Sequence, residues 1–342
     1  MQICSLLPSA TEILYALGLG DSVAGVTHEC DFPPDAAKKP PLIRPRVDPQ
    51  APPATIDRQV TELVSRGESI YAVDADLLAS LAPDLIITQD LCHVCAASPD
   101  DLATALTRFS KPPRILALTP HSLADVWDDI RRIGEATGRR RDAQGLAITL
   151  EQRVAAIEMK VAGVPRPRVL CLEWMDPFYV GGHWVPEMVA KAGGEDVLGR
   201  AGEPSFRATA QAIANTNAEI IVVMPCGYGA ARAAAEFKFE KLPESWSNLP
   251  AIRDRRIFAV DANSFFSRPG PRLAEGVALL AHIFHPDLVT CDLPDGTFRK
   301  IKMALKRTVK RAVVSASAGR KSALRTSTPR RLTTVRVAGP KC

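Results

Sequence analysis

The 342-residue chain is long enough for two domains, and its 46% hydrophobic and 24% charged residues are typical of a globular protein. No apolar run approaches the length that crosses a bilayer, and the first residues lack the pattern of a secretory signal. We therefore expect a cytoplasmic protein, or a periplasmic or cell-surface one if the true start lies upstream. Of the 43 Lys and Arg residues, 14 lie from Arg299 onward, where Asp and Glu are absent, so the first 298 residues hold 29 basic against 38 acidic side chains.

The first 137 residues alternate between expected strands and helices. Residues 3–7 read as a buried strand that turns into a helix ending at Leu17, with Ser9 as the expected N-cap and Glu12 three residues later. Residues 32–53 contain eight prolines, so we expect an extended surface excursion there and no regular element. The remaining expected strands cover 23–26, 83–88 and 114–118, and the remaining expected helices cover 56–66, 76–81, 100–109 and 123–137.

A long helix is expected from Arg139 to Ala162. Apolar side chains recur there at three- and four-residue steps, and a proline-rich exit at 163–167 ends the pattern. Beyond it strands and helices alternate again, with expected strands at 168–172, 220–224 and 257–260, and expected helices at 185–192, 209–215, 230–239 and 273–284. A single long helix between two similar halves predicts a strut, that is, a helix that joins two lobes rigidly.

The predicted fold class is α/β, with two Rossmann-like lobes joined by one long rigid helix and a ligand cleft between the lobes. The expected boundaries are an N-terminal lobe at 1–120, a helical connection at 121–163 that contains the linker helix 139–162, and a C-terminal lobe at 164–286. The basic tail at 299–342 has few large apolar groups, so we expect it to be disordered. A rigid strut also predicts a domain rotation below about 20° on ligand binding.

Several short motifs carry a resemblance to a known family. They are Ile3-Cys4-Ser5-Leu6-Leu7-Pro8-Ser9-Ala10-Thr11-Glu12-Ile13-Leu14, Gly18-Leu19-Gly20, Asp31-Phe32-Pro33-Pro34, Ala82-Pro83-Asp84-Leu85-Ile86, Ala192-Gly193-Gly194-Glu195 and Arg268-Pro269-Gly270-Pro271-Arg272. Over roughly residues 1 to 286 the chain resembles the helical-backbone substrate-binding proteins of ABC importers, and is most similar to their cobalamin-binding branch. The resemblance implies two lobes on a rigid helix, a cobalamin-like corrinoid or other metal chelate as ligand, an ABC permease as possible partner, and no catalysis.

Ligands of open α/β sheets bind beyond the carboxyl ends of the strands, so six loops are candidates for the site. Those in the second half are rich in aromatic side chains, which suits a large planar apolar ligand. The alternative for Phe178, Trp184 and Phe206 is that they cover the core. The candidate ligand-binding residues are Ser9, Thr11, His28, Glu29, Asp90, His93, Glu173, Trp174, Phe178, His183, Tyr228, Phe265 and Arg268.

Cys92-His93-Val94-Cys95 is a CxxC motif between an expected strand and an expected helix. It suits a redox pair or half of a zinc site, and His28 and Cys30 are the candidates for the other two ligands. The alternative is that both cysteines are plain buried thiols. A neutral imidazole of His28, His93 or His183 would also suit an axial position on a corrin cobalt.

Catalysis is poorly supported, because the chain has no Gly-x-Ser-x-Gly elbow, no phosphate-binding glycine loop and no His-Glu-x-x-His pair. We therefore expect a binding protein with no required cofactor. The alternatives are a metal- or redox-active thiol protein using Cys92 and Cys95, and a haem or ferric-siderophore binder. The basic tail suits contact with anionic surfaces, without sequence-specific recognition of nucleic acid.

Overall fold

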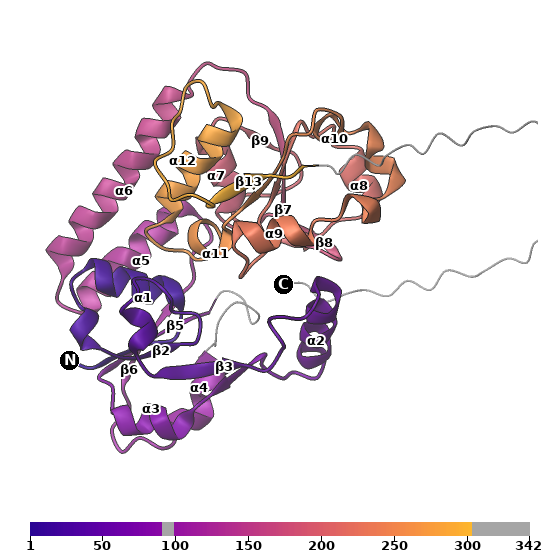
Figure 1. Cartoon of the computed structure of the whole chain (residues 1–342). Coiled ribbons are helices and arrows are strands. Elements are labelled where there is room, and N and C mark those ends of the chain that lie inside the picture. Colours follow the sequence, from indigo (N-terminus) through magenta and orange to yellow (C-terminus); the bar gives the residue numbers. More distant parts are fainter. Residues whose placement is uncertain (91–98, 303–342) are drawn as a thin grey trace, which may run out of the picture.

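The computed structural model describes residues 1–90 and 99–302 and contains two α/β lobes joined by a pair of helices (Figure 1). The N-terminal lobe has a six-stranded sheet in the order β4-β3-β2-β1-β5-β6, and the C-terminal lobe has a seven-stranded sheet in the order β10-β8-β7-β11-β12-β13, with β9 beside β7. The predicted fold class is confirmed. In the described part of the chain, no helix combines the length and apolarity needed to span a membrane.

The N-terminal sheet is parallel except at one edge. Its strands are β1 (Ile3–Ser5), β2 (Val23–Thr27), β3 (Pro41–Pro45), β4 (Tyr71–Val73), β5 (Leu85–Gln89) and β6 (Arg114–Leu118), and only β4 runs antiparallel to its neighbour. The helices of this lobe are α1 (Pro8–Ala16), α2 (Pro53–Ser65), α3 (Ala75–Leu81) and α4 (Pro99–Leu106). Every residue of β5 is buried, because helices cover both faces of a parallel sheet.

Two expectations for this lobe are wrong. The proline-rich stretch 32–53 contains β3, which brings Leu42 and Ile43 into the core and places prolines only at its two ends, where a missing N–H disturbs the ladder least. Helix α1 begins at Pro8 with Leu7 as its N-cap and no side-chain cap, so Ser9 is a buried residue of the first turn. A proline at the first helical position is already favourable, because its absent N–H would have had no partner.

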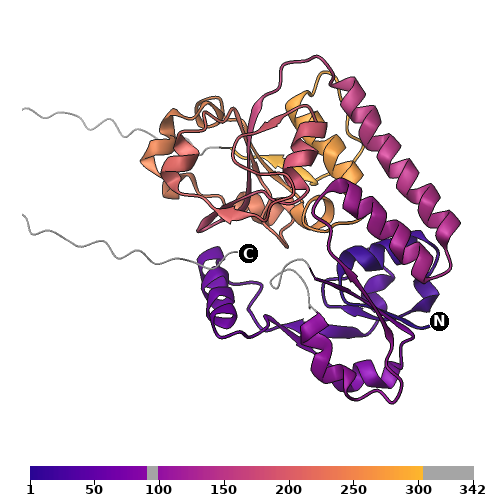
Figure 2. The same ribbon diagram turned by 180° about the vertical axis from the view of Figure 1, so that it is seen from behind.

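Helices α5 (Leu123–Ala136) and α6 (Arg140–Lys160) form the connection, and α6 runs along one side of both lobes (Figure 2). The predicted linker helix is thus present within two residues at each end. The two helices pack closely where Gly134 faces Ala143, since a Cβ on Gly134 would stand 2.2 Å from that of Ala143. One buried apolar cluster extends from the N-terminal lobe through α5 and α6 into the C-terminal lobe, so the connection is part of a continuous core.

The C-terminal sheet has a parallel centre and antiparallel edges. Its strands are β7 (Arg168–Met175), β8 (Phe178–Val180), β9 (Glu195–Asp196), β10 (Phe206–Arg207), β11 (Ile220–Val223), β12 (Ile257–Val260) and β13 (Phe298–Lys300). The helices are α7 (Val185–Lys191), α8 (Ala210–Ala214), α9 (Ala230–Glu236), α10 (Pro250–Arg253), α11 (Ala262–Phe265) and α12 (Leu273–Phe284). Helix α12, which is apolar on most of its surface, packs against both α6 and α7.

Strand β13 corrects two expected boundaries. Arg299 and Lys300 pair with Ala259 and Phe258 of β12, and the N–H of Ile301 donates to the carbonyl of Ile257. The C-terminal lobe therefore continues past 286 and includes the first residues assigned to the basic tail. The rest of that tail, from residue 303, lies outside the described residues.

Candidate functional site

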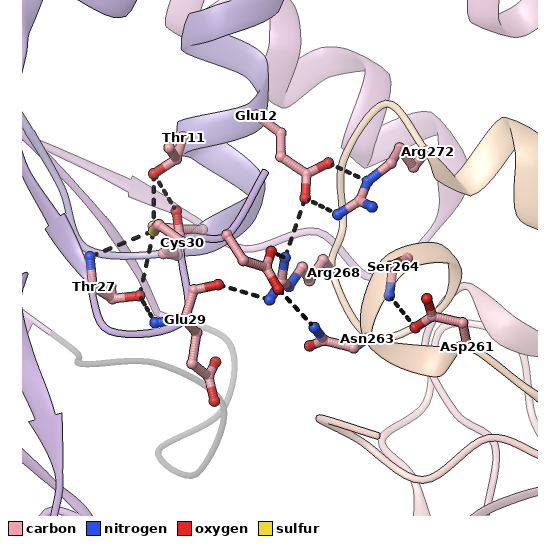
Figure 3. A network of polar contacts seen from close by, with 12 residues as sticks. Thr11, Glu12, Thr27, Glu29, Cys30, Asp261, Asn263, Ser264, Arg268 and Arg272 are labelled. Atoms are coloured by element: carbon pink, nitrogen blue, oxygen red, sulfur yellow. Dashed lines mark hydrogen bonds and ion pairs between the residues drawn. The ribbon is translucent and has the colours of Figure 1, made fainter. Parts of the chain in front are cut away.

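The two lobes meet first at a buried cluster of charges beside α1 (Figure 3). Arg268 and Arg272 are the first and last residues of the Arg-Pro-Gly-Pro-Arg motif before α12, and both contact the N-terminal lobe. Arg272 holds the Glu12 carboxylate with two hydrogen bonds, from Nε at 2.9 Å and from Nη2 at 2.5 Å. Arg268 donates to Asp31 Oδ1 at 2.5 Å and to the Glu29 carbonyl at 2.7 Å. We call Glu12, Asp31, Arg268 and Arg272 the interlobe clasp.

The clasp is largely shielded from water. Glu12 is 4% exposed and Arg268 is 7% exposed, while Asp31 lies at the solvent edge. Burial raises the pKa of Glu12, and both arginines act against that rise. Burial lowers the pKa of Arg268, but Asp31 and Glu12 more than compensate, so it stays above its ordinary value. The arginines thus favour the charged form of Glu12 where burial alone would disfavour it.

Three predicted ligand-binding residues are used elsewhere in this arrangement. Arg268 makes its hydrogen bonds to Glu12, Asp31 and Glu29 of the other lobe, and its contact with a ligand stays a prediction. Ser9 and Thr11 are buried on α1, and the hydroxyl of Thr11 lies 2.8 Å from Ser5 Oγ and 3.1 Å from Cys30 Sγ. Both side chains therefore lie inside the lobe in this structure.

A second contact between the lobes lies at α2, on the side opposite α6 (Figures 1 and 2). The indole Nε1 of Trp174 donates to the carbonyl of Pro53 at 3.3 Å, and Arg232 donates to the carbonyl of Ala51 at 3.4 Å. Burial raises the pKa of Asp57 on α2, while Arg207 and a hydrogen bond from Tyr179 lower it. Helix α2 thus touches the C-terminal lobe through a few polar contacts.

The aromatic side chains of the C-terminal lobe divide into two groups. Trp174 is half-buried and meets Tyr228 edge to face at 5.5 Å, with the Arg232 guanidinium 3.8 Å from the centre of the tyrosine ring. Phe178 instead packs on Trp246, 4.7 Å between ring centres, and Trp184 is 6% exposed with its N–H bonded to the carbonyl of Phe266. Trp174 faces the other lobe, whereas Phe178 and Trp184 support the core.

Tyr228 and Phe265 are largely buried in this structure, and their contact with a ligand stays a prediction. Both are buried, and Phe265 lies beside the Arg272 guanidinium at 5.7 Å from ring centre to Cζ. Phe265 therefore belongs to the clasp surroundings. Tyr228 packs against Trp174, and its hydroxyl is buried without a hydrogen-bond partner among the described residues.

Glu173 lies at an irregularity in the β7–β8 pairing, where the register shifts between Leu172 and Trp174. Such bulges redirect side chains. Burial raises the pKa of Glu173 to about 7, the nearby Asp196 raises it further, and the N–H of Gly182 opposes the rise with a 3.3 Å hydrogen bond. Gly182 can approach so closely because it has no side chain: a Cβ there would stand 2.2 Å from the Ser205 nitrogen.

Replacing Glu173 by glutamine is expected to stabilise the protein at high pH only. The folded-state pKa lies near 7 against an ordinary 4.5, so ionisation of this carboxylate costs stability above pH 7 and not below pH 4.5. The variant should be more stable than the wild type at pH 8, by on the order of 3 kcal/mol. Urea denaturation at a series of pH values measures this difference.

The control for that series is Glu195→Gln, which removes an exposed carboxylate paired with Arg168. Its effect should be small and nearly constant with pH. A Glu173→Gln difference that did not shrink as the pH fell from 8 to 5 would contradict the shifted pKa.

His183 pairs with a histidine of the connection that the sequence did not single out. Its ring centre lies 5.9 Å from that of His121, which follows β6, and it stacks on Trp184 at 5.6 Å. Burial lowers the pKa of His183, and the neighbouring His121 lowers it further. The imidazole therefore stays neutral at physiological pH, which is the form that binds metals.

The N-terminal candidates lie near the ends of β2 and β5. His28 bonds through Nδ1 to the carbonyl of Ile43, Glu29 is partly exposed, and Asp90 is exposed at the end of β5.

Cys92, His93 and Cys95 lie outside the described residues, so the proposed redox and zinc roles of the CxxC motif stay predictions. Cys30 is buried beside Thr11 and Thr27, and burial raises the pKa of its thiol. In the described ranges, no group of three His, Cys, Asp or Glu side chains is placed to hold a metal ion. Cys30 is thus a buried thiol of the N-terminal lobe, and its part in a metal site with Cys92 and Cys95 stays a prediction.

Comparison with known proteins places this arrangement in context. The family model described as periplasmic binding protein matches residues 3–264. An uncharacterised ABC transporter substrate-binding lipoprotein, YvrC of Bacillus subtilis, is 28% identical over 299 residues, covering 84% of this chain and 80% of the relative. The vitamin B12-binding protein of Vibrio parahaemolyticus is 22% identical over 279 residues, covering 81% and 86%. The apo structure of the periplasmic heme-binding protein RhuT from Roseiflexus sp. RS-1 superposes with a TM-score of 0.63 at 24% identity, covering 83% and 98%.

Proposed function

Because this chain belongs to the periplasmic binding protein family, the substrate-binding component of ABC importers, we propose that it binds a cobalamin-type corrinoid between its lobes and passes it to an ABC permease. The relatives compared above are named as binding proteins, in keeping with a function without catalysis. The observation that carries the choice of ligand is the half-buried Trp174, held against Tyr228 and facing the opposite lobe.

A corrin presents a flat apolar face with a polar rim and a central metal. Trp174 supplies a ring for the face, since aromatic side chains contribute large contact areas at little entropic cost. Asp90 and Glu29 are exposed or partly exposed near strand ends of the N-terminal lobe and suit amide groups on the rim. His183, neutral because it is buried beside His121, suits an axial position on the metal.

A haem is the second candidate, because the same neutral imidazole would bind iron and a haem-binding protein shares the fold. A ferric siderophore gains no comparable support from these residues, since it has no large planar face for Trp174. The two tetrapyrrole ligands differ in rim chemistry: amides on a corrin and carboxylates on a haem. The acidic character of residues 1–298 favours the corrin, whose amide rim it does not repel.

Titration with cyanocobalamin tests the proposal. We expect a change in the corrin absorption and a rise in melting temperature, both reduced in His183→Ala, with haemin titrated in parallel and followed by its Soret band. His282→Ala is the matched control, because His282 bonds to the carbonyl of Val289 within the C-terminal lobe. A Soret shift without a corrin response would replace the corrinoid by haem. No response to either ligand at high micromolar concentration would overturn the proposal.

The relatives also bear on location. They are named as a lipoprotein and as periplasmic proteins, and the expectation of a cytoplasmic protein gains no support from them. We propose the alternative, a periplasmic or cell-surface protein whose native start lies upstream. Mass spectrometry of the N-terminus of the protein purified from its own cells tests this; an N-terminus at Met1 in the cytosolic fraction would contradict it.

A further inference from the structure

We propose that the interlobe clasp is a fixed pivot that sets the separation of the two lobes, and that the site opens only at the opposite edge, where α2 meets the C-terminal lobe. Arg268 and Arg272 are thereby positioning residues: they hold Trp174 and His183 at a set distance from the N-terminal lobe. The role in ligand entry rests on the proposed binding function, whereas the fixed separation does not.

The clasp has the features of a permanent contact. Its two arginines make four hydrogen bonds of 2.5 to 2.9 Å to the N-terminal lobe, and its central carboxylate, Glu12, is nearly inaccessible to water. The turn between the arginines lies against α1 as well, since a Cβ on Gly270 would be 3.5 Å from Ser9 Cα. Separating these surfaces would leave buried charges unpaired, which is costly unless water replaces every partner.

Phe32 covers the clasp from the N-terminal side. Its ring centre lies 4.3 Å from the Arg272 guanidinium, with Phe265 of the C-terminal lobe at 5.7 Å. The guanidinium is thus held between a carboxylate and two aromatic rings contributed by both lobes. Cation and ring attract more strongly as water is excluded, so the rings reinforce the ion pair.

The α2 edge has the opposite character. Of the thirteen residues of α2, only Pro53 and Leu63 are buried, so the helix is weakly anchored to its own lobe. Both ribbon views show it standing apart from the other helices of that lobe, beside the β7–β8 hairpin (Figures 1 and 2). The bonds to the other lobe at this edge are those from Trp174 to Pro53 and from Arg232 to Ala51, which are 3.3 and 3.4 Å long, and one from Tyr179 to Asp57. Contacts of this kind are the first to open.

The strut alone would not produce this asymmetry. Helix α6 packs on α5 and on α12, which fixes how far apart the lobes lie along its axis. A connection made at one side still leaves rotation about its ends. The clasp joins the loop that leads into α12 directly to α1, and supplies the further contact that resists such rotation.

Spin labels on the ligand-free protein test the pivot. We would introduce them as noncanonical amino acids, because the chain has eight native cysteines. One pair, at the exposed Asp35 and Asp295, spans the clasp side; another, at the exposed Thr61 and Ala235, spans the α2 edge. The wild type should give a narrow distance distribution across the clasp and a broader one across the α2 edge.

The clasp is then weakened in two steps. Asp31→Asn removes the charge of the solvent-edge partner of Arg268 and leaves the core intact, and Arg268→Gln removes the buried charge. Each should broaden the distribution across the clasp, roughly twofold for Arg268→Gln, because more interlobe orientations become accessible. Arg153→Ala is the matched control: it breaks an exposed pair with Glu275 that joins α6 to α12 without involving the N-terminal lobe.

The pivot would be overturned if the distance distribution across the clasp were unchanged in both clasp variants. It would also be overturned if, in the wild type, that distribution were as broad as the one across the α2 edge. Adding cyanocobalamin should narrow only the distribution across the α2 edge; narrowing across the clasp instead would show that the site opens at the clasp, contrary to the proposal. If cyanocobalamin has no effect while the clasp variants still broaden the ligand-free distribution, the proposed ligand is wrong and the pivot stands.

Discussion

Replacing Glu12 by alanine is expected to lower the free energy of unfolding by about 3–5 kcal/mol, the cost of removing one partner from a buried ion pair. Glu12 is the shared acceptor of Arg272 and Arg268, and it is 4% exposed. Without it, the Arg272 guanidinium loses both of its hydrogen bonds to Glu12 and stays beside Phe32 and Phe265 with only 16% of its side chain exposed. Urea denaturation at neutral pH, followed through the unfolding of both lobes, measures the lost free energy of unfolding.

Two further variants show whether this loss arises from the unpaired charge. Glu12→Gln keeps the shape and one acceptor oxygen, so it should cost less than alanine. The double variant Glu12→Ala with Arg272→Met removes the stranded charge and should recover part of the stability. Arg153→Ala, which breaks an exposed pair, should change it by less than about 1 kcal/mol. A loss in Glu12→Ala no larger than in Arg153→Ala would contradict a buried, energetically significant clasp.

The strut and the alternation of strands and helices were predictable because their signals are local. Residues 139–162 repeat apolar side chains at the period of a helix, and α6 occupies 140–160. The same local signals do not predict β3, because a high proline content normally disfavours a strand. Pro41 and Pro45 stand only at the ends of that strand, while Leu42 and Ile43 between them are buried.

The sequence does not reveal the clasp, because the spacing of Ser9 and Glu12 suits a helix cap as well as an interlobe ion pair. Ser9 and Glu12 have the spacing of a capping box, with which the helix would have begun two residues later, at Ala10. In the structure Leu7 is the N-cap, and the Glu12 side chain turns toward residues more than 250 positions away in sequence. The quoted Arg-Pro-Gly-Pro-Arg motif was the available signal, but nothing in the sequence shows that its two arginines share one carboxylate.

Neighbouring aromatics were equally hard to separate from sequence. Trp174 and Phe178 flank one tight hairpin, and both were assigned to the ligand. The register shift in β7 turns Trp174 toward α2, while Phe178 packs on Trp246, more than sixty residues later in the sequence. Which ring faces the other lobe depends on a one-residue irregularity, and no composition or period encodes it.

Replacing Trp174 by alanine should weaken corrinoid binding roughly 30-fold, about 2 kcal/mol, as expected for a central aromatic contact. Stability should change little, since Trp174 is half-buried. The matched control is Trp184→Ala, which removes a ring that is 6% exposed and bonded to the Phe266 carbonyl. That variant should lose about 3–5 kcal/mol of stability.

The two tryptophans therefore separate binding from folding. Isothermal titration with cyanocobalamin and urea denaturation would be run on both variants and on Trp174→Phe, which keeps a ring but loses the N–H that bonds to Pro53. If the ring itself contacts the corrin, Trp174→Phe should retain most of the affinity. Loss of affinity equal to that of alanine would instead show that Trp174 acts by tethering α2. An affinity of Trp174→Ala equal to that of the wild type would remove Trp174 from the site.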